Sequence, residues 1–235
     1  MWDGRKATPE EQALGPMEST AEMNMDLKKL PSVLASIPGY VMMFKQAFPQ
    51  DPHPINVQNV GKAIATFERT VISGEAPFDR WINGDEGALT DEEKQGFMVF
   101  TGKANCGSCH SGWTFSDSSF HDIGLPTDDI GRGKLLPNIE KMQFAFKTVG
   151  LRNIALRGSY MHDGSIGTLE EVVEHYNSGF ISRPSLSDEI EPIDLTKEEK
   201  KQLVAFMRAL TSQDKPCLLV TSLCSEIFMN GGFSA

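Results

Sequence analysis

Three residues near the middle of the chain have the spacing of a covalent haem-attachment motif. Cys106, Cys109 and His110 form the pattern CxxCH, with two small residues between the cysteines. Thiols three residues apart on a helical turn match the separation of the two haem vinyl groups, and the adjacent histidine can bind the iron. A redox-active CxxC would need a βαβ setting, and a zinc site would need a second ligand pair, for which Cys217 and Cys224 are badly spaced. The motif therefore predicts one covalent c-type haem with His110 as an axial ligand.

The residue on the other face of the iron decides the chemistry. A methionine ligand raises the reduction potential and suits electron transfer, whereas an anionic tyrosine oxygen favours the ferric and higher oxidation states. Each side chain able to coordinate could equally be an ordinary core or half-buried residue. The candidates after the motif are His121, Met142, Met161, His162, His175, Tyr176 and Met207. By analogy with small cytochromes, the residues alone favour Met161.

Helix-start signals surround the motif. In a capping box a threonine is followed three residues later by a glutamate, and the two residues satisfy backbone N–H groups at the start of a helix. Such boxes begin at Thr8, Thr90, Thr168 and Thr196. The box at Thr196 leads into an apolar stripe with helical spacing, and we predict a further helix over 57–72 with Ile64 and Phe67 facing inward. No run alternates convincingly between apolar and polar residues, so the predicted class is all-α.

The composition is that of a globular protein with an acidic surface. The chain has 235 residues, of which 40% are hydrophobic, and a formal net charge of -10. This charge argues against nucleic acid as a partner and could steer a basic redox protein. No apolar run reaches the roughly 20 residues needed to cross a bilayer.

We expect a boundary between two units in the glycine-containing segment 82–88. It divides the chain into a first helical unit over 1–85, a haem domain over 86–212 and a tail over 213–235, for which the sequence indicates no role. Cys217 and Cys224 lie in that tail and could form a disulfide or remain two thiols. Covalent haem is attached outside the bacterial cytoplasm, so we expect a periplasmic protein although no signal peptide begins the sequence.

Several short motifs occur together in an order that resembles one protein family. They are WDGR at 2–5, QALGP at 12–16, AIATFERT at 63–70, PFDRW at 77–81, FHDIG at 120–124, LRN at 151–153 and SYMHDGSIGTLEEVVEHYNSG at 159–179. From Trp2 to about residue 210, the chain resembles the bacterial di-haem cytochrome c peroxidases and MauG-like enzymes. The resemblance implies two class-I cytochrome c-like domains. One holds an electron-transfer haem, which His110 would bind, and the other holds a haem that reacts with peroxide.

The resemblance also implies the second ligand of the electron-transfer haem. In the family this ligand lies fourteen residues after the histidine of the HDG motif, which here leads from His162 to Tyr176 (176 − 162 = 14). Peroxidases proper tend to have methionine there, and MauG-like members have tyrosine. The expected ligand therefore moves from Met161 to Tyr176.

Three further residues acquire catalytic roles through the resemblance alone. Trp2 resembles the tryptophan between the two haems, through which an electron or hole can hop from one haem to the other. Gln12 and Glu22 match residues that line the distal pocket of the first haem, where a carboxylate can shuttle protons. Without the resemblance, these positions would be taken for a helix and an exposed loop.

The chain departs from the family pattern in two respects. It contains one CxxCH, and the cysteines and histidine of the first haem have no counterpart. We therefore expect 1–85 to be a partial first domain that lacks its CxxCH, from a truncated or wrongly started gene. Family members often bind calcium through backbone carbonyls near positions 157 and 159. Val149 and Ser159 stand where the family usually has proline, which weakens the expectation of calcium.

The expected function is that of a periplasmic c-type haem oxidoreductase of the di-haem peroxidase/MauG-like type. Electrons would pass through the His110-ligated haem to peroxide chemistry at a second haem that this sequence does not encode. The expected partners are a small electron-donor redox protein and either hydrogen peroxide or a protein substrate. Two alternatives are a mono-haem electron-transfer cytochrome without peroxidase activity and a fragment without a stable fold.

Overall fold

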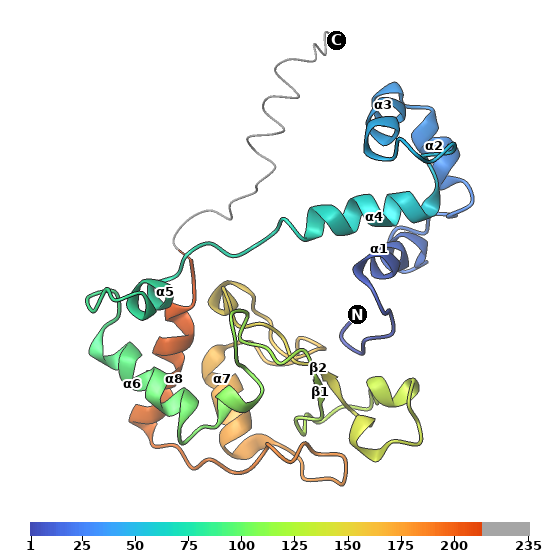
Figure 1. Ribbon diagram of the computed structural model, residues 1–235. Helices are drawn as coiled ribbons and strands as arrows, with labels where there is room; N and C mark the ends of the chain where they lie inside the picture. Colours follow the sequence, from blue (N-terminus) through green and yellow to red (C-terminus); the bar gives the residue numbers. More distant parts are fainter. Residues whose placement is uncertain (213–235) are drawn as a thin grey trace. The chain divides into compact units, whose positions relative to one another are not determined.

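A computed structural model describes residues 1–212 as two compact units. Lys6–Ile72 and Met1 form the first unit, and residues 73–212 and Trp2–Arg5 form the second. The regular secondary structure of both units is mostly helical (Figure 1). Within residues 1–212, no helix combines the length and apolar character that crossing a membrane requires. The tail predicted over 213–235, with its two cysteines, lies outside the described residues.

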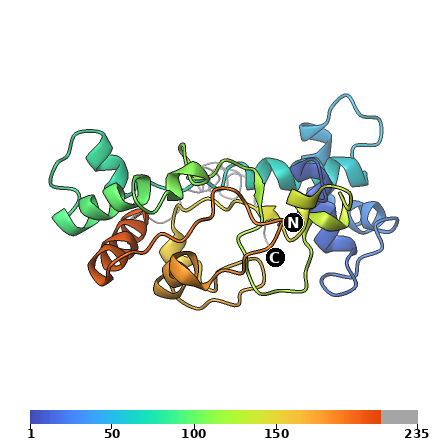
Figure 2. The ribbon, with the colours of Figure 1, turned by 90° about the horizontal axis from the view of Figure 1, so that it is seen from below.

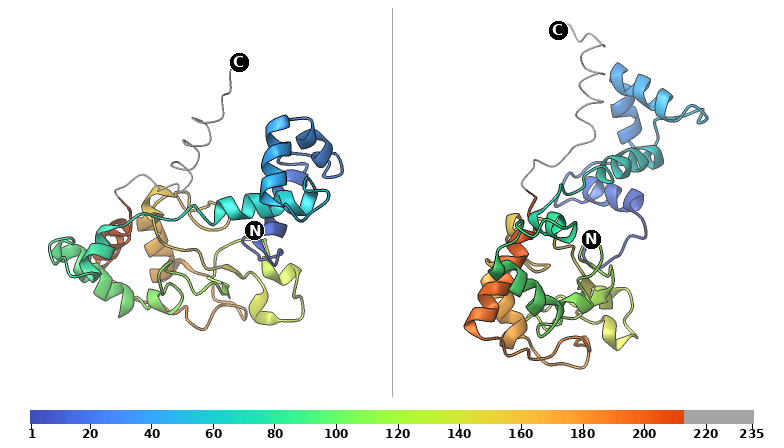
Figure 3. Two further views of the ribbon diagram at one scale, coloured as in Figure 1. Left: turned by 45° about the horizontal axis from the view of Figure 1, so that its top comes forward. Right: turned by 60° about the vertical axis from the view of Figure 1, so that its left-hand side comes forward.

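The first unit consists of two pairs of helices. Its helices are α1 (Pro9–Glu18), α2 (Leu30–Ala35), α3 (Pro38–Ala47) and α4 (Val57–Glu68). Helix α1 packs against α4, and α2 packs against α3 (Figure 3). The buried core is small and contains Leu30, Phe44 and Val60.

The helix predicted over 57–72 is present but shorter. It ends at Glu68, where the Thr70 N–H and hydroxyl both donate to the Phe67 carbonyl and close the last turn. Ile64 packs against the core of this unit, as predicted. The prediction for Phe67 is wrong because its side chain is 49% exposed.

The second unit contains the remaining helices and one small sheet. The helices are α5 (Pro77–Ile82), α6 (Asp91–Thr101), α7 (Leu169–Glu174) and α8 (Lys197–Ala209), with a π-helical turn η5 (His175–Gly179) after α7 and short 3-10 turns that include η1 (Cys106–Ser108). Strands β1 (Phe120–His121) and β2 (Phe146–Lys147) pair antiparallel. The regular structure is therefore mostly helical with one small sheet, whose two-residue strands are too short to produce a readable alternation in the sequence.

The predicted capping boxes start the helices that surround the haem motif. At Thr90, Thr168 and Thr196, the threonine hydroxyl accepts the N3 N–H and the glutamate accepts the N–H of the threonine. At Thr8 the hydroxyl caps the helix, but the glutamate carboxylate accepts from Ala7 N–H instead. These local contacts place α6, α7 and α8 within a turn of where the sequence predicts them.

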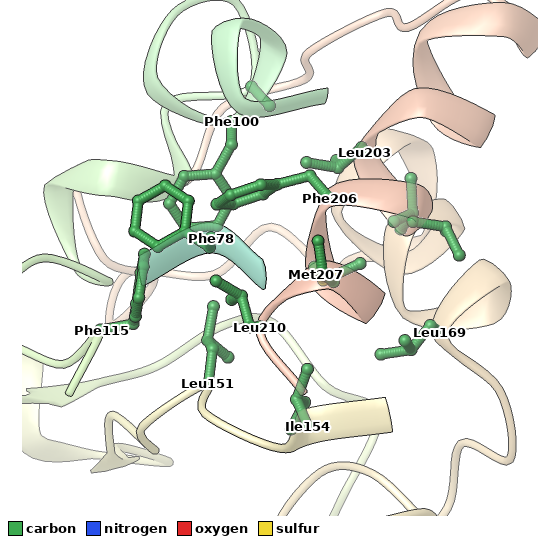
Figure 4. Close-up of a cluster of buried hydrophobic side chains, with 14 of the residues drawn as sticks. Phe78, Phe100, Phe115, Leu151, Ile154, Leu169, Leu203, Phe206, Met207 and Leu210 are labelled. Atoms are coloured by element: carbon green, nitrogen blue, oxygen red, sulfur yellow. The ribbon is translucent and has the colours of Figure 1, made fainter. Parts of the chain in front are cut away.

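Helices α6 and α8 lie side by side and hold the core of the second unit (Figures 1 and 2). They approach closely at Gly96, where a Cβ atom would lie 1.9 Å from the Gln202 carbonyl oxygen. Six aromatic rings pack together beside this crossing, and Phe206 is completely buried among them. Figure 4 shows Phe78, Phe100, Phe115 and Phe206 converging there.

The second unit begins at Ser73, ahead of the boundary predicted within 82–88. Helix α5 belongs to it because the Phe78 ring packs 5.5 Å from that of Phe206. Asp79 in the same helix forms a buried ion pair with Arg152. Trp2–Arg5 also belong to the second unit, since the Trp2 carbonyl accepts a hydrogen bond from Lys147 N–H at 2.7 Å.

Candidate haem-binding site

A cavity of about 340 Å³ lies inside the second unit. The CxxCH turn forms part of its wall, and Tyr176 forms another part. Most of the remaining wall is apolar and includes Phe100, Ile123, Leu125, Phe144, Leu151, Val173 and Leu203. An enclosure of this size with few polar groups is typical of a site for a bulky organic cofactor.

The CxxCH residues occupy a single helical turn, as the spacing predicts. Asn105 has a left-handed conformation (φ 50) and starts the 3-10 turn Cys106–Ser108. The turn continues to His110, whose N–H donates to the Cys106 carbonyl at 2.9 Å. Burial raises the pKa of the Cys106 thiol to about 12, so a free thiol at this position in the folded chain would be a poor nucleophile.

The His110 imidazole is oriented by the backbone. Its Nδ1 lies 2.9 Å from the Phe115 carbonyl oxygen, which assigns the proton to Nδ1 and leaves Nε2 as the coordinating atom. Burial lowers the pKa of His110, and the ring is therefore neutral, which is the form that binds metal. A backbone acceptor behind a ligating histidine fixes both its tautomer and its ring direction.

The structure separates the candidates for the second iron ligand. Met142 and His175 do not line the cavity, whereas the other five candidates do. His121 is engaged by Asp117 and by Ser187, at 2.8 and 3.0 Å. His162 is stacked on Phe146, with ring centroids 3.6 Å apart.

Three candidates that line the cavity are not held by hydrogen bonds or ring stacking of this kind, namely Tyr176, Met161 and Met207. Met207 is buried in α8 as part of the core. Within residues 1–212, the Tyr176 hydroxyl has no hydrogen-bond partner. Burial, with a further contribution from the two cysteines, raises the pKa of the Tyr176 phenol. A bound cation would reverse that effect, because it stabilises the phenolate.

Cys109, Asp117 and His121 form a polar cluster whose ligand atoms lie within 4.8 Å of one another. The pKa of His121 is raised to about 9, chiefly by the neighbouring Cys109 sulfur and then by the hydrogen bond to Asp117. This group is not a second metal site once haem is attached, because Cys109 is then a thioether. Asp117 was missed in the sequence, although an aspartate four residues before a histidine was a usable signal.

The three predicted catalytic residues belong to different units, with Trp2 in the second unit and Gln12 and Glu22 in the first. Trp2 lines the cavity and its side chain is 50% exposed. Gln12 lies half-buried in α1, and Glu22 is exposed in the turn that follows α1. Neither Gln12 nor Glu22 lines this cavity.

The residues present fit a c-type haem. One cavity contains a thiol pair one helical turn apart, a neutral imidazole with a free coordinating nitrogen, and a second oxygen or sulfur donor. Its apolar wall excludes water from a flat hydrophobic macrocycle.

Comparisons with known proteins agree with this geometry. A family model described as di-haem cytochrome c peroxidase matches residues 1–87. The methylamine utilization protein MauG of Methylorubrum extorquens is 48% identical over 214 residues, which cover 90% of this chain and 60% of that protein. MauG of Methylophilus methylotrophus is 49% identical over 213 residues, covering 89% and 63%. The chain thus spans a little under two thirds of the length of these relatives.

A solved structure extends the similarity to three dimensions. The crystal structure of a MauG-like protein associated with microbial copper homeostasis superposes with a TM-score of 0.78 at 30% identity. The match covers 90% of this chain and 73% of that one. The shared sequence and fold show that the chain belongs to the di-haem cytochrome c peroxidase/MauG family of oxidoreductases.

Proposed function

We propose that this protein is a periplasmic c-type haem oxidoreductase in which His110 and Tyr176 would bind the iron of one haem. The observation that supports this most strongly is a single cavity lined by both the CxxCH turn and Tyr176. Electron transfer through this haem is coupled to peroxide chemistry at a second haem, as in a two-haem member of the family. When bound, a c-type haem takes up and releases electrons at a potential set by its axial ligands.

The residues of the second unit have separable roles in this proposal. Cys106 and Cys109 hold the macrocycle, and the Phe115 carbonyl keeps the His110 ring in one orientation. Tyr176 supplies an anionic oxygen, which favours the ferric and more oxidised states over the ferrous state. That preference suits the oxidation of a protein substrate better than simple reduction of peroxide.

The residues outside this haem site retain their predicted roles as part of the proposal. Trp2 is an electron relay, for which its position at the rim of the cavity is suitable. Gln12 and Glu22 would belong to the pocket of the peroxide-reacting haem, where a carboxylate moves protons. The second unit would be a class-I cytochrome c-like domain and the first unit part of another. Calcium remains a prediction, and the partners are a small electron-donor protein and peroxide or a protein substrate.

The first experiment asks whether haem is bound covalently. Expression in a host that matures c-type cytochromes is expected to yield protein with a Soret band whose pigment resists extraction by acid acetone. Cys106→Ala with Cys109→Ala serves as the control and should lose covalent pigment. Colourless wild-type protein, or pigment that acid acetone removes, would refute the proposed covalent haem.

Replacing the tyrosine tests the second ligand. In Tyr176→Phe we expect altered ferric optical and EPR spectra and a higher reduction potential, because an anionic oxygen no longer stabilises ferric iron. Met161→Leu is the matched control, since Met161 also lines the cavity, and it should leave both properties unchanged. A Tyr176→Phe spectrum identical to wild type rules out the tyrosine ligand.

Peroxide turnover separates the proposal from a simple electron carrier. Peroxide-dependent oxidation of a reduced donor would exclude a mono-haem cytochrome without peroxidase activity. Reversible haem reduction with no turnover of peroxide would favour that carrier instead.

A further inference from the structure

The backbone that carries Tyr176 has an unusual conformation. Helix α7 ends at Glu174, and the chain continues through the π-helical turn His175–Gly179, in which Tyr176 is the second residue. A π-helical turn is wider than an α-helical turn, is rare, and often occurs at functional sites. Its less favourable geometry must be maintained by contacts with the rest of the fold.

His175, immediately before Tyr176, makes one such contact. Its side chain is 6% exposed, and its Nε2 lies 2.9 Å from the Ile123 carbonyl oxygen, 52 residues away along the chain. Because a carbonyl can only accept, the Nε2–H is the donor. The His175 ring also meets the Tyr176 ring edge to face, with centroids 5.3 Å apart.

Asn177, immediately after Tyr176, makes a second contact in another direction. Its Oδ1 accepts a hydrogen bond from Leu195 N–H at 2.7 Å. Leu195 is 5% exposed and directly precedes Thr196, the N-cap of α8. The turn is therefore bonded on one side of Tyr176 to the segment after β1 and on the other side to the start of α8.

The phenol between these two contacts has no polar partner of its own within residues 1–212. The direction of the Tyr176 side chain is consequently determined by its backbone turn and by the packing of its ring. We propose that His175 and Asn177 are positioning residues that brace this turn and keep the Tyr176 oxygen directed at the haem iron. This inference rests on the proposed role of Tyr176 as a ligand.

The proposal predicts that loosening either brace makes the tyrosine easier to displace from ferric iron. We would titrate the ferric haem protein with cyanide, which must compete with Tyr176. His175→Phe keeps an aromatic ring without the donor, and Asn177→Ala removes the acceptor. Each is expected to raise the apparent cyanide affinity by about tenfold, the usual order for one buried hydrogen bond.

Conservative variants and one matched control distinguish a positioning role of His175 and Asn177 from a general contribution to the stability of the fold. His175→Gln retains an N–H donor and Asn177→Asp retains an oxygen acceptor, so both should stay close to wild type in cyanide affinity and in the ferric EPR spectrum. Ser185→Ala removes a comparable buried bond, the 2.7 Å contact with Asp122, without touching the turn. It should lower thermal stability and leave cyanide affinity unchanged.

Three results would overturn the inference. If Tyr176→Phe binds cyanide more tightly but His175→Phe and Asn177→Ala match wild type, the brace is refuted while the tyrosine ligand stands. If Ser185→Ala raises cyanide affinity as much as the brace variants do, the effect is general loosening and the positioning role is refuted. If Tyr176→Phe itself leaves cyanide affinity and spectra unchanged, the ligand proposal and this inference both fail.

Discussion

The His121 imidazole lies between an acid and the cysteine that would carry haem. Asp117 and Ser187 hold its two nitrogens, and its side chain lines the cavity. The raised pKa of His121, about 9, is due first to the neighbouring Cys109 sulfur and then to Asp117. In the protein with haem attached, Cys109 is a thioether that cannot become a thiolate, so only Asp117 and its charge remain to raise the pKa.

The sign of the resulting pH dependence follows from linkage. A raised folded-state pKa means that protonated His121 contributes stability fully below pH 6.5, and that this contribution is lost as the pH rises toward 9. In the protein with haem attached, the stabilising contribution of protonated His121 should be lost completely at a lower pH, since Cys109 no longer raises the pKa. Thermal unfolding across this range should therefore show falling stability for wild type and a flatter profile for His121→Gln. His53→Gln, at an exposed histidine, is the control, and a profile for His121→Gln as steep as wild type would contradict the assignment.

At the scale of elements, the close crossing of α6 and α8 requires a glycine, Gly96, at the point of contact. A Cβ at Gly96 would lie 1.9 Å from the Gln202 carbonyl and 2.7 Å from Phe206 Cβ, so the two helices must separate to admit it. We expect Gly96→Ala to lower the free energy of unfolding by about 1–3 kcal/mol, as overpacking does, despite the better helix propensity of alanine.

Gly15 provides the matched control for this substitution. It also lies inside a helix, but the nearest atom to its Cβ position is Met1 Cε at 3.8 Å. Gly15→Ala should therefore cost less than Gly96→Ala, because only the ring of the next residue, Pro16, crowds the added methyl group. Urea unfolding of both variants checks the pair, and equal effects would refute the close-crossing explanation.

The contact between α5 and the LRN segment is a buried ion pair. Arg152 donates to both carboxylate oxygens of Asp79, at 2.8 and 2.7 Å, and its guanidinium stacks 3.6 Å from the Trp113 ring centre. Burial alone would raise the pKa of Asp79, but the hydrogen bonds from Arg152 and from Ala76 N–H lower it below its ordinary value. This pair explains why α5 belongs to the second unit.

Removing one partner of this ion pair should strongly destabilise the fold. We expect Asp79→Asn to lower the free energy of unfolding by roughly 3–5 kcal/mol, because it leaves a buried guanidinium without its counter-charge. The contribution of Asp79 is present above pH 3.8 and is lost as the pH falls through its lower folded-state pKa. Lys103→Ala, which breaks an exposed pair with Glu199, should leave the urea midpoint almost unchanged. Equal effects of the two substitutions on the urea midpoint would show that the buried Asp79–Arg152 pair contributes no more to stability than the exposed Lys103–Glu199 pair.

At the scale of the whole molecule, the two units have very unequal cores. Among residues 1–212, the core cluster of the second unit contains sixteen buried apolar residues, and that of the first unit contains three. Burial of apolar surface is the main favourable contribution to folding, so the first unit should unfold at a lower urea concentration. We expect far-UV circular dichroism to show a first transition during which the haem absorbance is unchanged.

Substitutions in each core test this order. Phe44→Ala should lower the midpoint of the first transition only, and Phe206→Ala that of the second only, each by removing a large buried ring at a cost of about 3–5 kcal/mol. A single transition that both variants shift together would mean that the two units unfold as one.

Much of the helical framework could be predicted from the sequence because its signals are local. A capping box needs only two residues three positions apart, and the boxes at Thr90, Thr168 and Thr196 are formed as predicted. One local prediction did not agree with the structure, namely the inward orientation of Phe67. Which face of a helix is buried depends on contacts between segments that are far apart in the chain.

The sequence by itself determined the chemistry available to this protein, because attachment of a c-type haem requires two thiols and an imidazole within five consecutive residues. Only the tertiary structure decided which distant side chains share the cavity with that motif. It places Met161 and Tyr176 on the cavity wall and excludes Met142 and His175. The physical reason is that a π-helical turn and the hydrogen bonds on either side of it, which join residues 52 and 18 positions apart, direct Tyr176, and no local pattern encodes such bonds.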